Sequence, residues 1–254
     1  MTSEQLAERV LAWYAEHGRE LPWRRTRDPY AILVSEVMLQ QTQVERVIER
    51  WTAWLERWPT AADLAAAPRA DVISAWQGLG YNRRAVALHE AAQRLAVDGI
   101  PQDQAGWRAL PGVGPYTAAA VCALALDHDV VPLDVNVQRI LERALGAATI
   151  EPPAGKGHDL TQALFDVGAT LCLARIPRCD QCPLAADCPS RGQRYEPQRK
   201  QSRFEGSRRQ ARGRLLDQLR AAPVPLDDCD AEIAASLVKD GLAEQRDGLL
   251  ALPS

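Results

Sequence analysis

The sequence has little of what would identify a basic, secreted or membrane protein. Only three of its 254 residues are lysine, and lysine and arginine together (30) do not outnumber aspartate and glutamate (33), which leaves a formal charge of −3. Because a nucleic-acid protein is usually strongly basic, any surface for nucleic acid has to be local. No apolar run approaches the length of a membrane span, and residues 1–5 lack the basic start of a signal peptide. We therefore expect a cytoplasmic protein that has no membrane partner.

Alternating apolar and polar residues, which mark strands, are also scarce. Alanine, leucine, arginine and glutamate are abundant, and these residues favour helices. The sequence predicts an all-α protein, long enough for one large domain or two modest ones and a tail. Periodicity and capping residues predict helices at about 4–17 with Ser3 as the N-cap, from Asp28 and Pro29 onward, around Trp51, Trp54 and Trp58, and over 71–76 and 83–97. The spacing of the three tryptophans places them in the core.

The composition changes after residue 190. Between residues 191 and 214, nine arginine and lysine residues are accompanied by only two glutamates. We place a linker at about 190–207, where dense positive charge suits contacts to phosphates that do not read sequence. Helices at about 212–221 and 231–239 and a hairpin within 241–252 are expected to follow. This order resembles a reduced winged helix.

Four of the six cysteines crowd into one segment. They are spaced Cys172-x6-Cys179-x2-Cys182-x5-Cys188, whereas Cys122 and Cys229 stand alone. In a reducing compartment such a cluster indicates metal binding before it indicates disulfides. A zinc site built from four cysteines usually has two separated Cys-x2-Cys pairs, and this segment has one pair with a single cysteine on either side. The spacing therefore favours a different centre, and zinc stays the alternative.

A glycine-rich hairpin joins two expected helices, one ending near Ala109 and one running to about Leu126. Residues 110–116 are Leu-Pro-Gly-Val-Gly-Pro-Tyr. Gly112 and Gly114 allow a sharp turn with no side chain in the way, and the amides that start the second helix present the positive end of its dipole. The hairpin therefore predicts a phosphate-binding site, with a plain turn between helices as the alternative.

The hairpin is followed about twenty residues later by the stretch Leu-Asp-Val-Asn-Val at 133–137. Together they resemble the active-site signature of the endonuclease III and MutY superfamily of DNA glycosylases, and the resemblance extends over about residues 4–190. It implies that Asp134 is catalytic and that Asn136 orients Asp134 or the attacking water. By its position before a helix, Asp134 is also suited to be an N-cap, and the two roles are compatible.

The spacing of the clustered cysteines is similar to the loop that holds one [4Fe-4S] cluster in this superfamily. Arg175 and Arg178 lie in the longest stretch between these cysteines. In the family this loop meets the DNA backbone, so both guanidinium groups are expected at phosphates, with solvated charges as the alternative. The resemblance implies one cluster with four ligands, Cys172, Cys179, Cys182 and Cys188.

Three further stretches resemble the MutY branch, which removes adenine. They are Leu-Pro-Trp-Arg at 21–24, Ser-Glu-Val-Met-Leu-Gln-Gln-Thr-Gln at 35–43 and Trp-Gln-Gly-Leu-Gly-Tyr at 76–81. The resemblance implies that Gln41 and Tyr81 enter the duplex as wedges, Tyr81 beside 8-oxoguanine, and that Arg24 and Gln162 face the adenine. Tyr116 stands where bifunctional relatives have a lysine that cuts the strand, so we expect a monofunctional enzyme.

The chemistry of such an enzyme asks for two carboxyl groups in different protonation states, as in glycoside hydrolysis. Glu36 lies on a helix face shared with apolar residues, where desolvation would raise its pKa and let it protonate N7 of the leaving adenine. A solvated helix residue is the alternative for Glu36. Asp134 at a helix start is expected to stay ionised and to stabilise the cationic sugar, with a transient covalent bond as a further option.

The resemblance implies a two-domain helix-hairpin-helix glycosylase fold. Its iron-sulfur domain is expected from residues 1–21 and 131–190, its helical barrel domain from 22–130, and a basic linker with a small winged-helix-like module from 191–254. The expected partner is double-stranded DNA in which adenine is opposite 8-oxoguanine or guanine. The protein itself is expected to be a monomer.

Three features depart from the MutY pattern. Val135 stands where glycine is usual, the stretch 143–165 is shorter by about one helix, and the tail is too short for the Nudix-like domain that checks for 8-oxoguanine. We therefore expect a narrower preference for 8-oxoguanine over guanine, set by Tyr81 and Gln41. A thymine or uracil mismatch glycosylase of the same superfamily and a catalytically idle DNA-binding protein are the alternatives.

Overall fold

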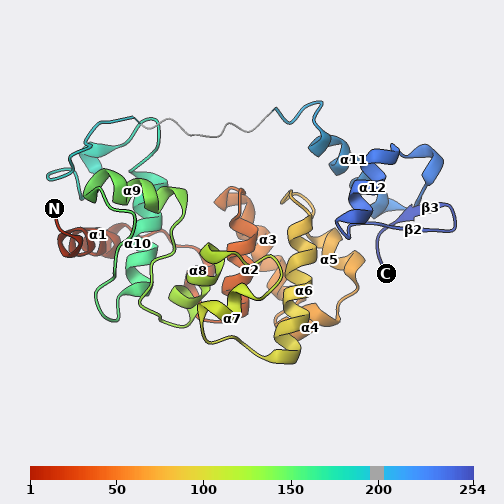
Figure 1. Ribbon diagram of the computed structural model, residues 1–254, viewed down its shortest axis with the longest axis horizontal. Helices are drawn as coiled ribbons and strands as arrows, with labels where there is room; N and C mark the ends of the chain where they lie inside the picture. Colours follow the sequence, from red (N-terminus) through yellow and green to blue (C-terminus); the bar gives the residue numbers. More distant parts are fainter. Residues whose placement is uncertain (195–202) are drawn as a thin grey trace. The chain divides into compact units, whose positions relative to one another are not determined.

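Helices dominate the computed structural model, which describes residues 1–194 and 203–254 (Figure 1). The α-helices are α1 Ser3–His17, α2 Pro29–Leu39, α3 Val44–Arg57, α4 Ala61–Ala66, α5 Arg69–Ala75, α6 Arg83–Asp98, α7 Gln104–Arg108, α8 Pro115–Ala125, α9 Val135–Leu145, α10 Gly157–Thr170, α11 Arg208–Ala221 and α12 Ala231–Lys239. Short 3-10 turns are η1 Pro22–Arg25, η2 Cys179–Gln181 and η3 Leu226–Asp228, and the strands are β1 Val224–Pro225, β2 Glu244–Arg246 and β3 Leu249–Ala251. The predicted all-α class is confirmed. Within the described ranges, every helix is too short or too polar to cross a membrane.

Contacts divide the chain into two compact units. The first consists of Met1–Glu36, Pro101–Ala109 and Val113–Arg199, and the second of Val37–Ile100, Leu110–Gly112 and Lys200–Ser254. The domain boundaries expected from the sequence stay a prediction.

The core of the first unit lies between α1, α9 and α10. Leu6, Val10, Ile140, Leu164 and Val167 are among the side chains that fill it. Their spacing of three or four residues along each helix places them on one face, which is why these helices bury a single stripe.

The start of α1 differs from the expectation by one residue. Thr2, not Ser3, is the N-cap, since its side chain accepts a hydrogen bond from the Gln5 amide while the Gln5 side chain accepts one from the Thr2 amide. A capping box needs Glu or Gln three residues after the cap. Thr2 has Gln5 at that distance and Ser3 has Leu6, so only Thr2 completes the box.

The tryptophans of the second unit lie in its core, as their spacing predicts. Trp51, Trp54 and Trp58 are all buried. Trp54 makes edge-to-face contacts with Trp58 at 4.7 Å and with Trp76 at 5.4 Å between ring centroids. Such pairs stabilise beyond their buried area, so this cluster fixes the segment that ends at Trp76.

The C-terminal residues form a small module within the second unit. Its helix α11 begins four residues earlier than expected, because the Ser207 hydroxyl caps it by accepting from the Gln210 amide at 3.3 Å. The strands pair antiparallel in the order β1-β3-β2. The module's buried apolar side chains are continuous with Ile73 of α5 and Val86 of α6. The expected helix, helix and hairpin are therefore present, and the winged-helix assignment stays a prediction.

The hairpin glycines offer a matched test of backbone strain. Gly112 has φ +74°, and a Cβ there would lie 2.7 Å from the Cβ of Ala87. A Cβ at Gly114 would meet no atom within 4 Å, and its φ is an ordinary −86°. We expect Gly112→Ala to lower the free energy of unfolding by about 1–3 kcal/mol, because it combines a left-handed conformation with a clash. Gly114→Ala should cost less, since it only exchanges one N-cap residue for another. Thermal denaturation of both variants measures the difference, and equal losses would contradict it.

Candidate active site

Glu36 is a carboxyl group buried in the middle of α2. Its exposed fraction is 4%, and its neighbours in α2 are buried and, apart from Ser35, apolar. Burial raises the pKa of Glu36 from 4.5 to about 7; a hydrogen bond from Tyr116 opposes this rise and the negative charge of Asp134 adds to it. Near neutral pH the group is therefore poised between its acid and its base form, and it is not the solvated helix residue that the sequence left as an alternative.

Tyr116 is the hydrogen-bond partner of Glu36. It lies in the first turn of α8, directly after the hairpin, and its ring is 6.3 Å from that of Phe165. Burial, followed by the nearby charge of Glu36, raises the pKa of the Tyr116 phenol well above its usual value. The phenol is thus a fixed neutral donor to the Glu36 carboxyl group.

Asp134 caps the helix that follows it. Its Oδ1 accepts hydrogen bonds from the backbone amides of Asn136 at 2.9 Å and Val137 at 2.7 Å. Its Oδ2 accepts from the Asn136 side-chain amide at 2.8 Å. The predicted N-cap is confirmed, and donors at the positive end of a helix stabilise a negative carboxylate.

Helix α9 connects this carboxylate to the cysteine segment. Arg139 donates from Nη2 to the Asn136 side-chain oxygen at 2.8 Å and from Nε to the Cys172 carbonyl at 2.7 Å. Arg139 also donates to the carbonyl of Gly168, where a Cβ would lie 2.8 Å from the Asn136 Cβ. Arg139 was missed from the sequence, because its role depends on α9 and α10 packing closely.

Arg24 and Gln162 both contact protein groups on or near α10. Arg24 donates from Nη1 and Nη2 to the two oxygens of Asp166, at 2.8 and 2.7 Å, and Arg19 binds the same carboxylate. Burial opposes ionisation of Asp166, but the hydrogen bonds from Arg24 and Arg19 hold its pKa below the usual value. Asp166 was also missed from the sequence, because no sequence pattern links it to Arg19 and Arg24, which lie far from it along the chain.

Gln162 is buried one helical turn before Asp166. Its Oε1 accepts from the Tyr14 hydroxyl at 2.6 Å and its Nε2 lies 2.6 Å from Nε2 of His158. Gln162 is therefore part of α10, and Arg24 contacts the same helix through Asp166.

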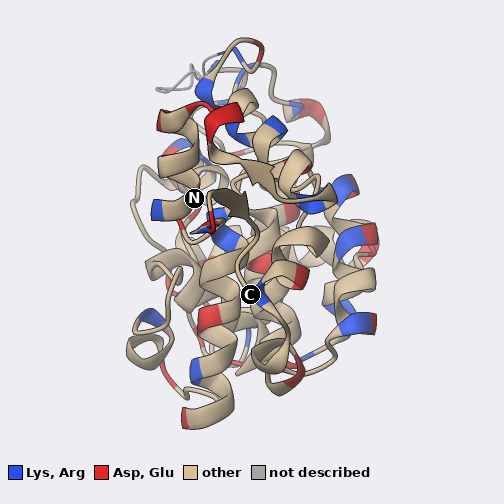
Figure 2. Cartoon of the chain, turned by 90° about the vertical axis from the view of Figure 1, so that its right-hand side faces the viewer, with Lys and Arg blue, Asp and Glu red and all other residues tan. Residues whose placement is uncertain are grey.

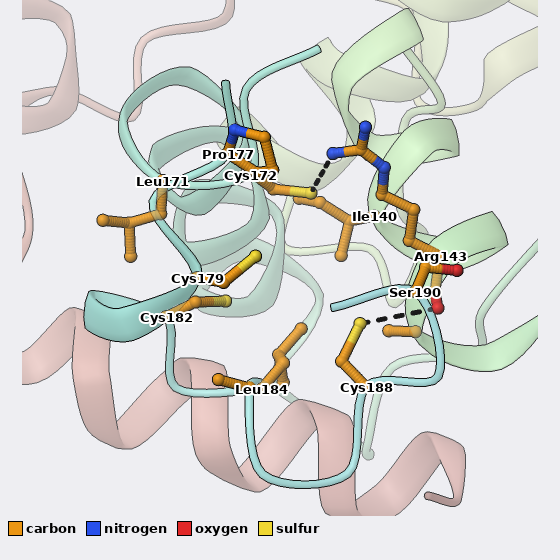
Figure 3. Close-up of a pocket in the computed structure, with 12 residues that line it drawn as sticks. Ile140, Arg143, Leu171, Cys172, Pro177, Cys179, Cys182, Leu184, Cys188 and Ser190 are labelled. Carbon is orange, nitrogen blue, oxygen red and sulfur yellow. Dashed lines mark hydrogen bonds between the residues drawn. The ribbon is translucent and has the colours of Figure 1, made fainter. Parts of the chain in front are cut away.

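The clustered cysteines converge on one pocket (Figure 3). Cys172, Cys179, Cys182 and Cys188 line it together with apolar side chains such as Leu171 and Leu184, and Cys122 and Cys229 lie elsewhere. Two N–H groups are directed at the sulfurs, the Gly192 amide at 3.2 Å from Cys179 Sγ and Arg143 Nη1 at 3.5 Å from Cys172 Sγ. In the part of the chain that the structure describes, no three or more His, Cys, Asp or Glu side chains are arranged around a single metal ion, whereas in an iron-sulfur cluster each of the four thiolates binds a different iron.

The hairpin has the predicted helix boundaries. Helix α7 ends at Arg108, and α8 begins at Pro115 with Gly114 as its N-cap. Arg175 and Arg178, in the cysteine segment, are exposed. These positions leave the hairpin amides and both guanidinium groups as candidates for phosphate contacts.

The two expected wedge residues share an unusual backbone. Gln41 has φ +57° and Tyr81 has φ +46°, both in the left-handed region that non-glycine residues rarely adopt. Both belong to the second unit, and 42% of Tyr81 is exposed. Strained non-glycine residues occur often at functional sites.

Residues 34–161 match the family model described as HhH-GPD superfamily base excision DNA repair protein. The chain belongs to this superfamily. Among solved structures, a thermostable thymine-DNA glycosylase is 28% identical with a TM-score of 0.68, over 74% of this chain and 95% of that one. Endonuclease III trapped on DNA gives a TM-score of 0.64 at 22% identity, over 74% of this chain and 96% of that one. The helix-hairpin-helix fold expected from the sequence is thereby confirmed.

The more similar relatives share one name. The adenine DNA glycosylase of Mycolicibacterium smegmatis is 40% identical, over 96% of this chain and 94% of the relative. The adenine DNA glycosylase of Homo sapiens is 39% identical, over 74% of this chain and 39% of the relative. Because the first match covers nearly the whole chain, it takes in most of the C-terminal module as well.

The buried carboxyl group makes stability depend on pH. The pKa of Glu36 is raised to about 7 in the folded chain. The part of the free energy of unfolding that depends on Glu36 is therefore fully present below about pH 4.5 and is lost as pH rises through 7. Glu36→Gln removes the ionisation, so we expect the variant to be more stable than wild type at pH 8 by up to about 3 kcal/mol. Urea denaturation at pH 5 and pH 8 measures this. Glu142→Gln, at an exposed position of α9, is the control, and the same pH dependence in Glu36→Gln and wild type would contradict the assignment.

Proposed function

We propose that this protein is an adenine DNA glycosylase of base excision repair, a hydrolase that cleaves the N-glycosyl bond of adenine mispaired in double-stranded DNA. The observation that carries the proposal is the pair of carboxyl groups held in opposite environments, Glu36 buried against Tyr116 and Asp134 at a helix start. The relatives that are about 40% identical carry this name. We expect the enzyme to act as a monomer in the cytoplasm.

Glu36 is the general acid in this proposal. A carboxyl group with a pKa of about 7 is protonated in a large fraction at neutral pH and can give its proton to N7 of the adenine as the base leaves. The phenol of Tyr116 orients the carboxyl group through its hydrogen bond. Tyr116 has no amine with which to form a Schiff base, so the enzyme should release the base without cutting the strand.

Asp134 stabilises the cationic sugar that forms when the glycosyl bond breaks. Its two oxygens are held by backbone and side-chain amides at 2.7–2.9 Å, so its orientation is set before substrate binds. A preorganised negative group of this kind requires little rearrangement during the reaction. Asn136 holds Oδ2 and acts as the positioning residue for Asp134.

The adenine has to leave the duplex before this chemistry can occur. We propose Gln41 and Tyr81 as the wedges and the hairpin at Gly112 and Gly114 as a phosphate contact, with Arg175 and Arg178 as further phosphate contacts. Arg24 and Gln162 would recognise the base, and their hydrogen bonds to Asp166 and Tyr14 keep both side chains in place.

The opposite base is 8-oxoguanine or guanine in this proposal. The basic linker at about 190–207 would contact phosphates; its residues 195–202 lie outside the described part of the chain. The module after it is nearly neutral, with eight acidic and seven basic residues between Arg208 and Ser254, and Figure 2 shows acidic and basic residues interspersed along the helices. The module thus has no net positive charge with which to attract DNA, and discrimination is left to Tyr81 and Gln41.

Two alternatives are less well supported. A thymine or uracil glycosylase has the same fold, but the thymine-DNA glycosylase structure is 28% identical and the adenine glycosylase relatives are 40% identical. A catalytically idle DNA-binding protein would not need a carboxyl group buried at the energetic cost that the raised pKa of Glu36 indicates.

A panel of duplexes tests the function. Adenine opposite 8-oxoguanine and opposite guanine should be excised, thymine or uracil opposite guanine should not, and strand breaks should appear only after alkali. Asp134→Asn and Glu36→Gln should each lower the single-turnover rate by about 10²–10⁴-fold while DNA affinity stays nearly unchanged, because both act in the transition state. Excision of thymine but not adenine would refute the adenine assignment, and loss of affinity equal to the loss of rate would refute the catalytic roles.

We also propose that Cys172, Cys179, Cys182 and Cys188 hold one [4Fe-4S] cluster. Four thiols meet in one pocket with N–H groups directed at two of the sulfurs, and thiolates with hydrogen bonds to sulfur are the usual environment of such clusters. A single Cys-x2-Cys pair with one cysteine on either side favours this unit over a four-cysteine zinc site. When bound, the cluster would tie the ends of this segment together.

The cofactor proposal predicts a yellow-brown protein with about four iron and four sulfide per chain. Cys182→Ser should lose iron and soluble yield, because ligand binding organises the surrounding loop. Cys229→Ser, whose thiol lies in the C-terminal module, should keep both. Metal analysis and the visible absorption spectrum measure this, and one zinc per chain without sulfide would refute the cluster.

A further inference from the structure

One guanidinium group joins the two loops that carry Gln41 and Tyr81. Arg84 lies in the first turn of α6 and is partly buried. Its Nη1 donates to the carbonyls of Val37, Met38 and Gln40 at 2.7, 3.2 and 2.6 Å. Its Nη2 donates to the Thr42 hydroxyl at 3.2 Å and to the carbonyls of Leu79 and Gly80 at 3.0 Å each. Residues immediately before both wedge positions are therefore bound by a single side chain.

The carbonyl groups that Arg84 binds need a donor. Helix α2 ends at Leu39, so the carbonyls of its last turn have no amide four residues later to pair with. The chain then turns through the left-handed Gln41, and on the other side the carbonyls of Leu79 and Gly80 precede the left-handed Tyr81. A buried carbonyl without a donor is costly. Arg84 donates to both sets at once, and it is joined by Trp76 Nε1 at the Gly80 carbonyl (3.1 Å) and by the Thr42 hydroxyl, which lies 3.3 Å from the Leu79 carbonyl and 3.4 Å from that of Gln40.

Arg84 also contacts the aromatic rings of Tyr81 and Trp76. Its guanidinium carbon lies 5.6 Å from the ring centroid of Tyr81 and 5.3 Å from that of Trp76, distances at which a cation is attracted to an aromatic face. Tyr81 is thus held through its ring as well as through the preceding backbone.

The charge of Arg84 is balanced without a carboxylate. Burial lowers its pKa to about 10, so it stays a cation at neutral pH. No carboxylate within the described ranges forms an ion pair with it; the same is true of the buried Arg139, which donates to the carbonyls of Cys172 and Gly168. Carbonyl dipoles and aromatic faces replace the carboxylate, and all of them belong to the two loops or to residues beside them.

We propose that Arg84 is a positioning residue: it holds Gln41 and Tyr81 together in their left-handed conformations before DNA binds. Two strained residues on separate loops would otherwise have to be ordered during binding, and each ordering step would reduce the fraction of enzyme that is ready to open the duplex. The inference rests on the proposed function, in which both residues act as wedges.

The test compares Arg84→Met with Arg94→Met, a matched control on the exposed side of the same helix, where Arg94 pairs with Asp98. Single-turnover excision is measured on adenine opposite 8-oxoguanine and on adenine opposite an abasic analogue, a duplex in which no opposite base has to be wedged. Arg84→Met should lower the first rate by about 10- to 100-fold and the second much less. Arg94→Met should change neither.

Two further measurements separate positioning from loss of structure. The pH at which the rate is half-maximal reports Glu36 and should not move in Arg84→Met. In a Tyr81→Ala background the effect of Arg84→Met should largely vanish, because residues that act through one another are not additive. If Arg84→Met is insoluble, Arg84→Lys replaces it; lysine keeps the charge but not the six-acceptor geometry, and should show the same selective loss.

The outcomes distinguish this inference from the function on which it rests. Wild-type enzyme that excises adenine from neither duplex would refute the proposed function. Wild-type activity on both, with Arg84→Met or Arg84→Lys losing equally on both duplexes or with additive effects in the Tyr81→Ala background, would refute the positioning role alone.

Discussion

The candidate site depends on one carboxyl group that is kept out of water. Glu36 is buried among mostly apolar residues of α2 and accepts a hydrogen bond from the neutral Tyr116, and burial raises its pKa to about 7. Asp134 has the same chemical group in the opposite environment, at a helix start with amides on both oxygens. The two carboxyl groups are chemically alike, but they differ in burial and in the donors around them.

Helix α9 connects Asp134 to the cysteine segment within the first unit. It begins at the Asp134 cap, carries Asn136 and Arg139, and reaches the cysteine pocket through Arg143. Hydrogen bonds join Asp134 to Asn136 and Asn136 to Arg139, and Arg139 donates to the carbonyl of Cys172 in the segment after α10. A disturbance of the cysteine loop would therefore reach the Asp134 carboxylate through a short series of contacts, which gives the proposed cluster a structural part even without redox chemistry.

The second unit contains the two strained loops that carry Gln41 and Tyr81. Gln41 and Tyr81 have left-handed backbones, and their surroundings must compensate for that conformation. The Trp54 cluster fixes the segment before Tyr81, and Arg84 supplies the donors. The C-terminal module packs on Ile73 and Val86 of the same unit, and Asp217 of α11 accepts a hydrogen bond from Gln77 at 3.2 Å. The small C-terminal module thus adds support to the loop that ends at Tyr81.

Local chemistry decided what could be predicted from the sequence. The hairpin helices, the Asp134 cap and the buried tryptophans follow from caps, glycines and spacings within a few residues, and the structure has them where expected. Asp166 beneath Arg24, Tyr14 beside Gln162, Arg139 and Arg84 could not be predicted, because each acts on residues brought near only by packing. The pKa of Glu36 belongs to both levels: its apolar helix is visible in the sequence, but the Tyr116 hydroxyl and the Asp134 charge reach it only when α2, α8 and α9 come together.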